Sequence, residues 1–426
     1  MRLLIIGIGG VGQAAAMLIK EGEKHGGQWI DTMVLADYDY ERAKKVAALA
    51  DDHRFVAAQV DASDKAAILA LVEKHNINFI LNTVAPVFNE PIFDAAYEAG
   101  VGYMDCAMTL SQRHPEKPYE QTYVKLGDYQ FARQEDWKKK NILAIVGSGV
   151  EPGVSDVFAR FAEKHLFDEI DEIGVRDGDN YQIPGQEVAF GFSIWTTIEE
   201  CLNPPIVWEK DRGWFTTECF SEPENFFFPG GIGNVEVVNI EHEEVILIPQ
   251  YVKCKRCTFK YGVSREFRIM LKNLEALGLD RIDKKIKVGD SEISPRDFIG
   301  LVAPSPLDLA TEMVGKGCAG TWVTGKKDGL FRSVYLYQLA DNQECVKKYG
   351  TSSVVTQTAI GPVIMLDLIA HGVWKGVGVL GPEFFNPDPF VLKMKEYGFP
   401  AALYEKDSEY DEQYQRDEIF NEMFSS

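Results

Sequence analysis

Three glycines near the N-terminus have the spacing of a dinucleotide-binding turn. Gly7, Gly9 and Gly12 form the pattern G-x-G-x-x-G between an apolar run, 3–6, and a stretch with helical character, 13–23. Gly7 permits a tight turn out of the strand, Gly9 lets the backbone approach a pyrophosphate, and Gly12 lets the helix pack closely on the strand. The start of the helix would offer free N–H groups to the phosphates. The sequence therefore predicts a Rossmann dinucleotide site; the alternative is a glycine turn in an α/β domain without a ligand.

A carboxylate follows the second apolar run. Residues 33–36 are typical of a strand that ends at Asp37, whose carboxylate can accept hydrogen bonds from the hydroxyls of the adenosine ribose. Because this carboxylate would repel a 2′-phosphate, we expect NAD(H) to be preferred over NADP(H). Arg42 and the pair 44–45 lie a turn or more further on and are interpreted as solvated helix residues, not as a phosphate clamp.

The first 150 residues alternate short apolar runs with helical stretches. We expect strands at 3–6, 33–36, 55–60, 79–84, 101–106 and 142–146, and helices at 13–23, 43–50, 65–75, 91–99 and 123–140. Ser63 and Asn89 are the expected caps of the third and fourth helices. Strands that alternate with helices in this way predict an α/β fold with a parallel, doubly wound Rossmann sheet.

Ligands of such sheets bind outside the carboxyl ends of the strands. This rule places 61–62 beside the adenine, 83–86 beside the ribose and nicotinamide, and both 105–106 and 147–153 near the reacting end. The predicted cofactor-binding residues are therefore Gly7, Gly9, Gly10, Val11, Gly12, Asp37, Asp61, Ala62, Thr83, Val84, Ala85, Val150 and Pro152.

Composition limits the classes of protein that this chain can belong to. Its 426 residues leave room for two domains, and its formal net charge of −21 argues against nucleic acid as a partner. We find no run of eighteen apolar residues and no secretory signal, so we expect a cytoplasmic protein without a membrane span. The seven cysteines are interpreted as reduced. Cys254 and Cys257 form a C-x-x-C pair without a second ligand pair, and are interpreted as two unrelated cysteines in a strand.

The pattern changes after residue 150, which we take as the end of the Rossmann domain. Residues 151–340 are predicted to form an α+β domain for substrate binding and dimerisation, and 341–426 a C-terminal segment whose helices return to the first domain. The expected strands are 170–175, 235–240, 245–248 and 258–261, with a hairpin at 320–324 and 333–339; the expected helices are 196–202, 266–277 and 352–371. The acidic tail, 405–422, is expected to be a solvated helix or a frayed end.

Several segments resemble the saccharopine dehydrogenase-like family, which includes saccharopine reductase, carboxynorspermidine synthase and lysine 6-dehydrogenase. The resemblance rests first on GVEPGV (149–154), which follows the sixth strand and opens a helix, together with the N-terminal glycines. It covers most of the chain through LAD (35–37), VDA (60–62), WTTIEE (195–200), HEE (242–244), SPRD (294–297), KDG (327–329), GPE (381–383) and DPF (388–390). LAD and VDA are more similar to the lysine 6-dehydrogenase branch, and HEE with the late segments to the carboxynorspermidine branch.

The resemblance implies an NAD(P)-dependent oxidoreductase that acts on a C–N bond of a lysine-like amino acid or a polyamine conjugate, with hydride transfer to or from an imine. It also implies a homodimer. The alternatives are an oxidative deaminase of the lysine 6-dehydrogenase type and an NAD-binding sensor without turnover. A short-chain dehydrogenase is not indicated, because its Tyr-x-x-x-Lys pair is missing from the required position after the fourth strand; Tyr123 and Lys125 there have the wrong spacing.

Such a reaction needs an acid/base group for the amine. The catalytic candidates are Asp105 at a strand end, Glu151 in the loop nearest the expected nicotinamide, and His242 between strand-like runs. Each has a structural alternative, as a helix cap, a salt-bridge partner or a core histidine. No metal is expected at 242–244, because no further histidine or cysteine lies nearby.

The reaction also needs groups that hold the substrate. Cys106 lies at the predicted reacting end, cationic side chains could clamp a carboxylate, and an aromatic or hydroxyl side chain could line the pocket. Solvation or core packing is the alternative for each. The predicted substrate-binding residues are Cys106, Arg176, Trp195, Thr197 and Lys260.

Overall fold

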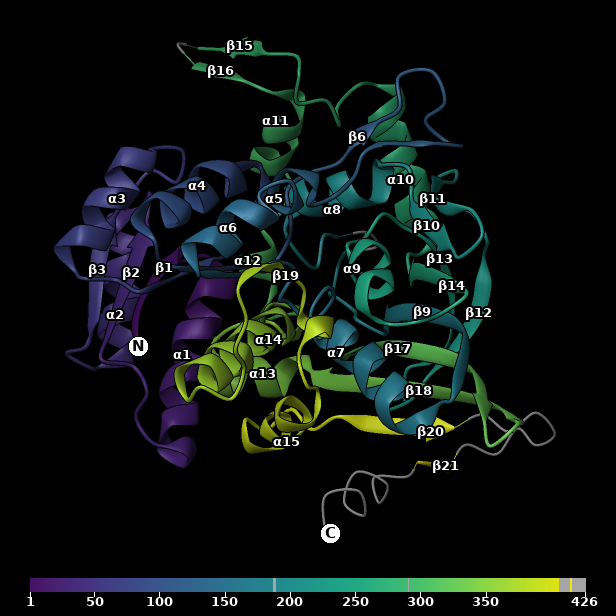
Figure 1. Ribbon diagram of the computed structural model, residues 1–426. Coiled ribbons are helices and arrows are strands. Elements are labelled where there is room, and N and C mark those ends of the chain that lie inside the picture. The colour runs from purple at the N-terminus through teal and green to yellow at the C-terminus, as the bar shows by residue number, and fades with distance from the viewer. Residues whose placement is uncertain (187–188, 290, 406–413, 416–426) are drawn as a thin grey trace.

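The computed structural model describes residues 1–186, 189–289, 291–405 and 414–415. Within them, a parallel sheet has the strand order β19-β8-β5-β4-β1-β2-β3; its strands β1, β2 and β3 are on the left of Figure 1. Its strands are β1 (Arg2–Ile6), β2 (Thr32–Asp37), β3 (Phe55–Gln59), β4 (Phe79–Asn82), β5 (Gly102–Asp105), β8 (Leu143–Ile145) and β19 (Gly378–Leu380). The predicted Rossmann sheet is confirmed, and β19 adds a strand from the far end of the chain beside β8.

Helices connect the strands of this first sheet. Leu3, Leu4 and Ile5 are consecutive and all fully buried, because a parallel strand covered by helices on both faces has no solvent side. The helices are α1 (Gly10–Gly26), α2 (Tyr40–Ala50), α3 (Lys65–Lys74), α4 (Asn89–Ala99), α5 (Asp128–Phe131) and α6 (Gln134–Lys140), with the short 3₁₀ turn η1 (Pro86–Phe88) and the small hairpin β6 (Gln112–Arg113) and β7 (Thr122–Val124).

A second, mixed sheet dominates the other half of the molecule, on the right of Figure 1. Its path is β11-β10-β14-β9-β17-β18-β20-β21, with β13 joining β14 and β12 joining β13. The strands are β9 (Glu169–Asp179), β10 (Ile206–Glu209), β11 (Gly213–Thr216), β12 (Glu224–Phe228), β13 (Gly233–Asn239), β14 (Arg256–Tyr261), β17 (Lys316–Lys327), β18 (Leu330–Asp341), β20 (Ala402–Glu405) and β21 (Tyr414–Gln415). The long β17–β18 hairpin confirms the one predicted around residues 326–329.

Helical segments connect and flank these strands. They are α7 (Val154–Phe161), the π turn η2 (Ala162–Leu166), α8 (Ile194–Leu202), α9 (Glu244–Tyr251), α10 (Arg265–Ala276), α11 (Pro295–Val302) and α12 (Pro306–Leu309). A small hairpin, β15 (Ile286–Val288) and β16 (Ser291–Ile293), projects at the top of Figure 1.

The C-terminal part returns to the first sheet, as predicted. It contains α13 (Asn342–Tyr349), α14 (Ser353–Ala370), the 3₁₀ turn η3 (Pro382–Phe384) and α15 (Asp388–Glu396). Helix α14 packs on α1, and a Cβ at Gly361 would lie 2.2 Å from the carbonyl oxygen of Gly149, so this helix needs a glycine there. By length and composition alone α14 could cross a membrane, but 78% of it is buried inside the protein, as in the core helix of a globular domain.

Several local predictions were wrong. Residues 123–140 form β7, α5 and α6 instead of one helix, because Gly127 adopts a left-handed conformation between them. Residues 245–248 belong to helix α9, where all four are buried, and a short apolar run does not distinguish a buried helix from a strand. Asp64, not Ser63, caps α3. Asn89 begins α4 without capping it, since its side chain bonds to Asn82 and Ala107.

Most of the tail predicted at 405–422 lies outside the described residues. Within the described part, Glu405 ends β20 and residues 414–415 form β21, which pairs with β20. Both cysteines of the C-x-x-C pair are buried and free, and Cys257 lies in β14, with Cys254 just before that strand.

Candidate active site

The glycine-rich turn follows β1 directly and leaves space above the start of α1. Gly7 has a φ of +97°, and a Cβ there would lie 2.4 Å from Val84. A Cβ at Gly12 would lie 2.1 Å from the carbonyl oxygen of Gly7, whereas one at Gly9 would meet no protein atom within 4 Å. The first turn of α1 has no side-chain cap. Protein packing thus explains two of the glycines, and the open approach at Gly9 beside uncapped N–H groups fits a pyrophosphate.

Asp37 is buried beside this turn. One carboxylate oxygen accepts the N–H of Ile8 at 2.7 Å, and the other accepts the N–H of Asp39 at 2.9 Å and lies 3.3 Å from the guanidinium of Arg42. These contacts hold the carboxylate where the ribose hydroxyls of a dinucleotide would lie. The loop 61–62, also expected beside the adenine, follows β3 at the same edge of the sheet.

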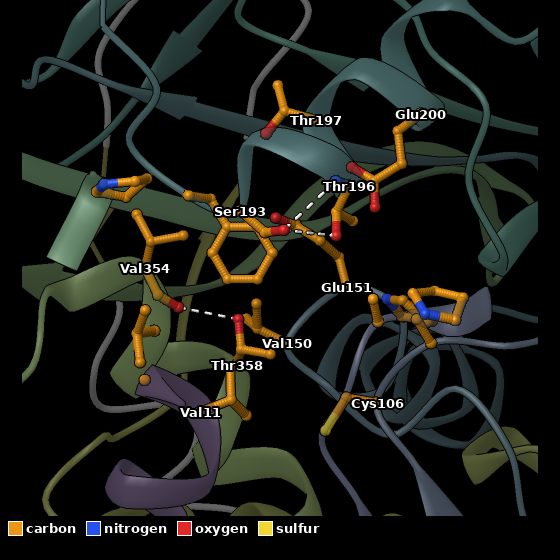
Figure 2. A pocket seen from close by; sticks show the side chains of 18 of the residues that line it. Val11, Cys106, Val150, Glu151, Ser193, Thr196, Thr197, Glu200, Val354 and Thr358 are labelled. Carbon is orange, nitrogen blue, oxygen red and sulfur yellow. Dashed lines mark hydrogen bonds between the residues drawn. The ribbon is translucent and has the colours of Figure 1, made fainter. Parts of the chain in front are cut away.

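A cavity of about 380 Å³ begins at the glycine turn and extends to the second sheet (Figure 2). It brings together many of the residues predicted from sequence: Gly10, Val11, Thr83, Val84, Ala85, Cys106, Val150, Glu151, Pro152, Thr197 and His242. Its other walls come from the second sheet, from α8 and from the start of α14. The cavity therefore joins the reacting end of a cofactor site to a chamber built by a different part of the chain.

Two carboxyl groups from different elements meet in the cavity wall. Glu151 lies in the loop before α7 and Asp177 on β9, and their side chains share a hydrogen bond, which requires one proton. Burial and the Asp177 charge raise the pKa of Glu151 well above its ordinary value. Burial also raises the pKa of Asp177, but the bond from Glu151 and the charge of His242 limit the rise to about 6. At neutral pH Glu151 is therefore the protonated partner.

His242 carries a positive charge in this cavity. Its ring stacks on Phe259 with 3.9 Å between centroids, and its Nδ1 lies 2.6 Å from Glu244 and 3.4 Å from Glu243. Burial alone would lower the pKa of His242, but these carboxylates outweigh it and raise the pKa to about 10. Ligand atoms of the three residues lie within 4.8 Å of one another, close enough for a metal. In this arrangement the His242 imidazolium hydrogen-bonds to Glu244 and lies within ion-pair distance of Glu243.

Helix α8 turns its first residues toward the cavity. The Ser193 hydroxyl oxygen caps the helix by accepting the N–H of Thr196 at 3.3 Å, and the Thr196 hydroxyl bonds to it at 2.9 Å (Figure 2). Thr197 and Glu200 also line the cavity. Burial raises the pKa of Glu200 to about 8; the charge of His242 opposes the rise, and the neighbouring carboxylates add to it.

The opposite side of α8 is fixed by a buried ion pair. Arg296 on α11 pairs with Glu199, and its guanidinium lies 4.7 Å from the ring centre of Trp195. Glu199 also accepts a hydrogen bond from Asn203 at 2.8 Å. Trp195, predicted to bind substrate, does not line the cavity; it supports the helix that does.

Asp105 lies outside the cavity wall and holds the loop that carries Glu151. Its carboxylate accepts the N–H of Gly147 at 2.8 Å, the hydroxyl of Tyr103 at 2.9 Å and the amide of Gln130 at 2.5 Å. Burial raises its pKa to about 7, although these hydrogen bonds oppose the rise. Asp105 therefore has the surroundings of a positioning residue, and the next residue, Cys106, lines the cavity.

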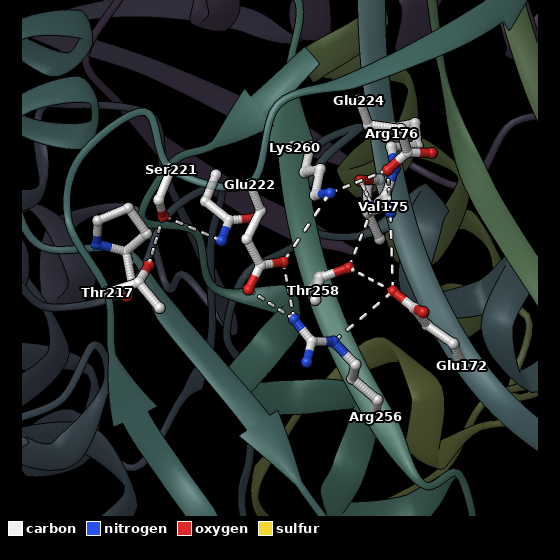
Figure 3. A network of polar contacts seen from close by, with 12 residues as sticks. Glu172, Val175, Arg176, Thr217, Ser221, Glu222, Glu224, Arg256, Thr258 and Lys260 are labelled. Atoms are coloured by element: carbon white, nitrogen blue, oxygen red, sulfur yellow. Dashed lines mark hydrogen bonds and ion pairs between the residues drawn. The ribbon is translucent and has the colours of Figure 1, made fainter. Parts of the chain in front are cut away.

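The predicted cationic clamps lie on the other face of the second sheet. Arg176 and Lys260 both bind Glu224, at 3.1 and 2.9 Å (Figure 3). Side chains alternate along a strand, so Arg176 and Lys260 point away from the face on which their neighbours Asp177 and Tyr261 line the cavity. The structure does not bring either cation to the cavity.

Sequence reasoning missed most of the acidic wall. Asp177, Glu200 and Glu243 line the cavity but were not among the predicted site residues. The sequence did hold one indication of Asp177. Residues 176 and 177 are adjacent and oppositely charged in a predicted strand, so their side chains must point to opposite faces of the sheet. Which face would meet the cofactor depends on how the two sheets are joined, and that is not encoded locally.

Comparison with known proteins identifies the family. The saccharopine dehydrogenase NADP binding domain matches residues 3–145, and the saccharopine dehydrogenase C-terminal domain matches residues 149–399. The chain belongs to the saccharopine dehydrogenase family. The predicted family is thereby confirmed, and with it an NAD(P)-dependent oxidoreductase.

Individual relatives cover nearly the whole chain. Carboxynorspermidine synthase of Vibrio alginolyticus is 29% identical over 405 residues, 93% of this chain and 95% of that protein. Carboxyaminopropylagmatine dehydrogenase of Synechocystis sp. is 28% identical over 402 residues, 94% of this chain and 96% of that protein. The solved structure of saccharopine dehydrogenase (L-Glu forming) from Saccharomyces cerevisiae has a TM-score of 0.65 at 13% identity, covering 95% of this chain and all of that one. That likeness supports the fold.

Proposed function

We propose that this protein forms a secondary amine by reductive condensation of a cationic amine with a carboxylate-bearing aldehyde or keto acid. The observation that carries the proposal is the charge of the cavity at the reacting end of the cofactor site. Among the described residues that line it are four carboxyl groups and one histidine, and no lysine or arginine. Such a wall attracts an amine with more than one positive charge. The names of the two bacterial relatives, which refer to carboxylated polyamine derivatives, agree with it.

The chemistry needs two steps. The amine and the carbonyl lose water to form an imine, and the imine carbon then takes a hydride while its nitrogen takes a proton, giving the secondary amine. A bound dinucleotide supplies the hydride. Glu151, protonated at neutral pH, is positioned to give a proton to the departing hydroxyl or to the nitrogen, and the Asp177 carboxylate to hold the ammonium nearby.

The groups that would bind the substrate's carboxylate are neutral donors. Ser193, Thr196 and Thr197 lie at the start of α8, inside the cavity. Helix N-termini favour negative charge, and hydroxyl groups there can donate to an oxyanion. In this proposal the roles of Arg176 and Lys260 are structural, and Asp105 positions the Glu151 loop.

We further propose a preference for NAD(H), a homodimer, a cytoplasmic location, and no nucleic acid or membrane partner. Asp37 next to the glycine turn supports the cofactor preference, because its carboxylate opposes a 2′-phosphate; Arg42 beside it weakens that repulsion. The division into residues 1–150, 151–340 and 341–426 belongs to the same proposal. Light scattering at twice the monomer mass would support the dimer.

The proposal is tested by following NADH and NADPH oxidation at neutral pH. The amines are lysine, diaminopropane, putrescine and ammonia, and the carbonyls are 2-oxoglutarate, aspartate semialdehyde and aminoadipate semialdehyde. We expect turnover with a diamine, a secondary amine detected by mass spectrometry, and faster turnover of NADH at equal concentration. Turnover with ammonia as the only productive amine would favour the oxidative deaminase, because reductive amination by ammonia is the reverse of that reaction. Tight NADH binding without turnover of any pair would contradict the proposal and favour a sensor.

A further inference from the structure

A second cavity of about 1120 Å³ adjoins the first. Phe192, Thr197, Tyr261 and Val354 line both cavities. These four residues therefore form a wall between two neighbouring chambers. The first chamber holds Glu151 and Asp177 at the reacting end. The second extends away from the cofactor site and is not used by the chemistry proposed above.

Strand β9 runs along both chambers. Asp177 lines the first and Asp179 the second. Residues two apart in a strand point to the same face and lie about 6.6 Å apart. Tyr261 of β14, which is paired with Asp177 in the sheet register, lines both chambers. This two-residue repeat along the strand is close to the separation of the two nitrogens in an extended diamine with a four-carbon chain.

Asp179 has no cationic partner among the described residues. One of its oxygens accepts the N–H of Tyr181 at 3.0 Å. Burial, together with the charge of Asp177, raises its pKa to about 7, despite that hydrogen bond. Two basic side chains, Arg265 and Arg268, also line this chamber; Arg268 is paired with Glu236, and neither arginine forms an ion pair with Asp179. A cationic ligand at Asp179 would supply the missing counter-charge.

We propose that Asp179 binds a second cationic group of the amine substrate, whose chain runs along β9 from Asp177 to Asp179. This inference rests on the proposed function, because it takes the reacting amine to lie beside Glu151 and Asp177. The substrate class is then an extended dication: a primary amine whose other end carries an ammonium or a guanidinium. Asp179 sets specificity for the distal charge and takes no part in the hydride or proton transfer.

The test compares dications with a monocation of matched length. Wild-type and Asp179→Asn proteins are assayed with 1,4-diaminobutane, agmatine and butylamine, each with the carbonyl partner that supports turnover. The asparagine keeps the acceptor for Tyr181, so the strand end should remain folded. We expect KM for the two dications to rise about 10- to 100-fold in the variant, as for loss of a charged hydrogen bond. The kcat at saturation, and both constants for butylamine, should stay unchanged.

Glu236→Gln is the matched control, since Glu236 lines the same chamber but is already paired with Arg268; it should leave the dication KM within about twofold. A larger effect on agmatine than on 1,4-diaminobutane would identify a guanidinium as the distal group, and the reverse an ammonium. An equal loss for butylamine, or no loss for either dication, would overturn the role of Asp179.

Calorimetric binding to the NADH-bound protein separates this inference from the proposed function. Dication binding that Asp179→Asn weakens, without turnover of any amine, would refute the reaction and retain the subsite. Turnover of wild-type and variant with the same amine selectivity would retain the reaction and refute the subsite. Neither binding nor turnover would refute both.

Discussion

Strands β9 and β14 carry ionisable residues on both faces, and the two faces differ in how those charges are partnered. On the outer face, the one opposite the cavity, Arg176 and Lys260 pair with Glu224, and Arg256 pairs with Glu222 (Figure 3). Arg256 also pairs with Glu209. On the inner face, Asp177 has another carboxyl group, Glu151, as its hydrogen-bond partner. The outer face is neutralised by its own side chains, whereas the inner face carries an excess of negative charge.

This difference separates structural charges from those available to a ligand. In a buried ion pair each charge is already neutralised by its partner, so neither is available to bind a substrate. Removing one member leaves the other charge unpaired. Carboxyl groups that outnumber the nearby cations, as those around His242 do, keep raised pKa values, and such groups concentrate at functional sites. An excess of unpaired carboxyl groups is therefore a better indication of the substrate site in this protein than the presence of a basic residue.

The largest effect is expected on the inner face. Glu151→Gln removes the proton that the Glu151–Asp177 pair shares but keeps the shape of the side chain. Loss of a positioned acid or base lowers rates about 10²- to 10⁴-fold, so we expect kcat to fall by that factor in the NAD(P)H-oxidation assay, with dinucleotide binding by fluorescence unchanged. Glu222→Gln, on the outer face, is the control and should retain kcat. Full activity of Glu151→Gln would mean that the proton comes from elsewhere.

A change on the outer face should affect folding instead of catalysis. Arg176→Met leaves Glu224 with Lys260 as its remaining described cation and removes a hydrogen bond to Thr258. Breaking a buried pair costs about 3–5 kcal/mol, and we expect a loss near the lower limit in urea unfolding because Lys260 remains. The kcat of the folded variant should equal that of the wild type. A fall in kcat at unchanged stability would return Arg176 to the substrate site.

The contrast also explains which parts of the site could be predicted from the sequence. The glycine turn, Asp37 and the loop containing Val150 and Glu151 are local features placed by a topological rule, and they do lie at one end of the Rossmann sheet. The prediction of Arg176 as a substrate-binding residue rests on its charge alone. Strand alternation shows that Arg176 and Asp177 face opposite ways, but not which of them faces the cofactor.

Long-range pairings account for the rest. Strand β19 joins the first sheet beside β8 after more than two hundred intervening residues, and its three-residue run carries no pattern of its own. The position of Glu200 in the cavity also depends on a long-range contact. Its neighbour Glu199 on α8 forms an ion pair with Arg296, which lies on a separate helix. Helical periodicity places the two acids on different sides of α8, and only the packing of α11 against it decides which one is left for the cavity.

The pH dependence of stability compares both faces in a single experiment. In the folded protein burial raises the pKa of Asp177 from 3.8 to about 6 and that of Asp179 to about 7. Between about pH 4 and 7 the folded chain therefore retains protons that the unfolded chain has lost. Unfolding releases them, so the free energy of unfolding should rise as the pH falls through this range, by at most about 1.4 kcal/mol per pH unit for each proton.

The outer face should respond in the opposite direction and at lower pH. Burial would raise the pKa of Glu224, but Arg176 and Lys260 outweigh it and lower the pKa below 4.5. Its stabilising contribution is present above pH 4.5 and is lost as the pH falls further. Urea unfolding at constant ionic strength should thus give a maximum in stability near pH 5. Asp177→Asn should make the fall on the alkaline side less steep, because only Asp179 then contributes to it, and should leave the acid side unchanged. A free energy of unfolding that instead falls steadily from pH 7 to 5 would contradict this prediction. It would mean that the inner carboxyl groups have cationic partners in the folded protein, as the outer ones do, and that the two faces do not differ in charge.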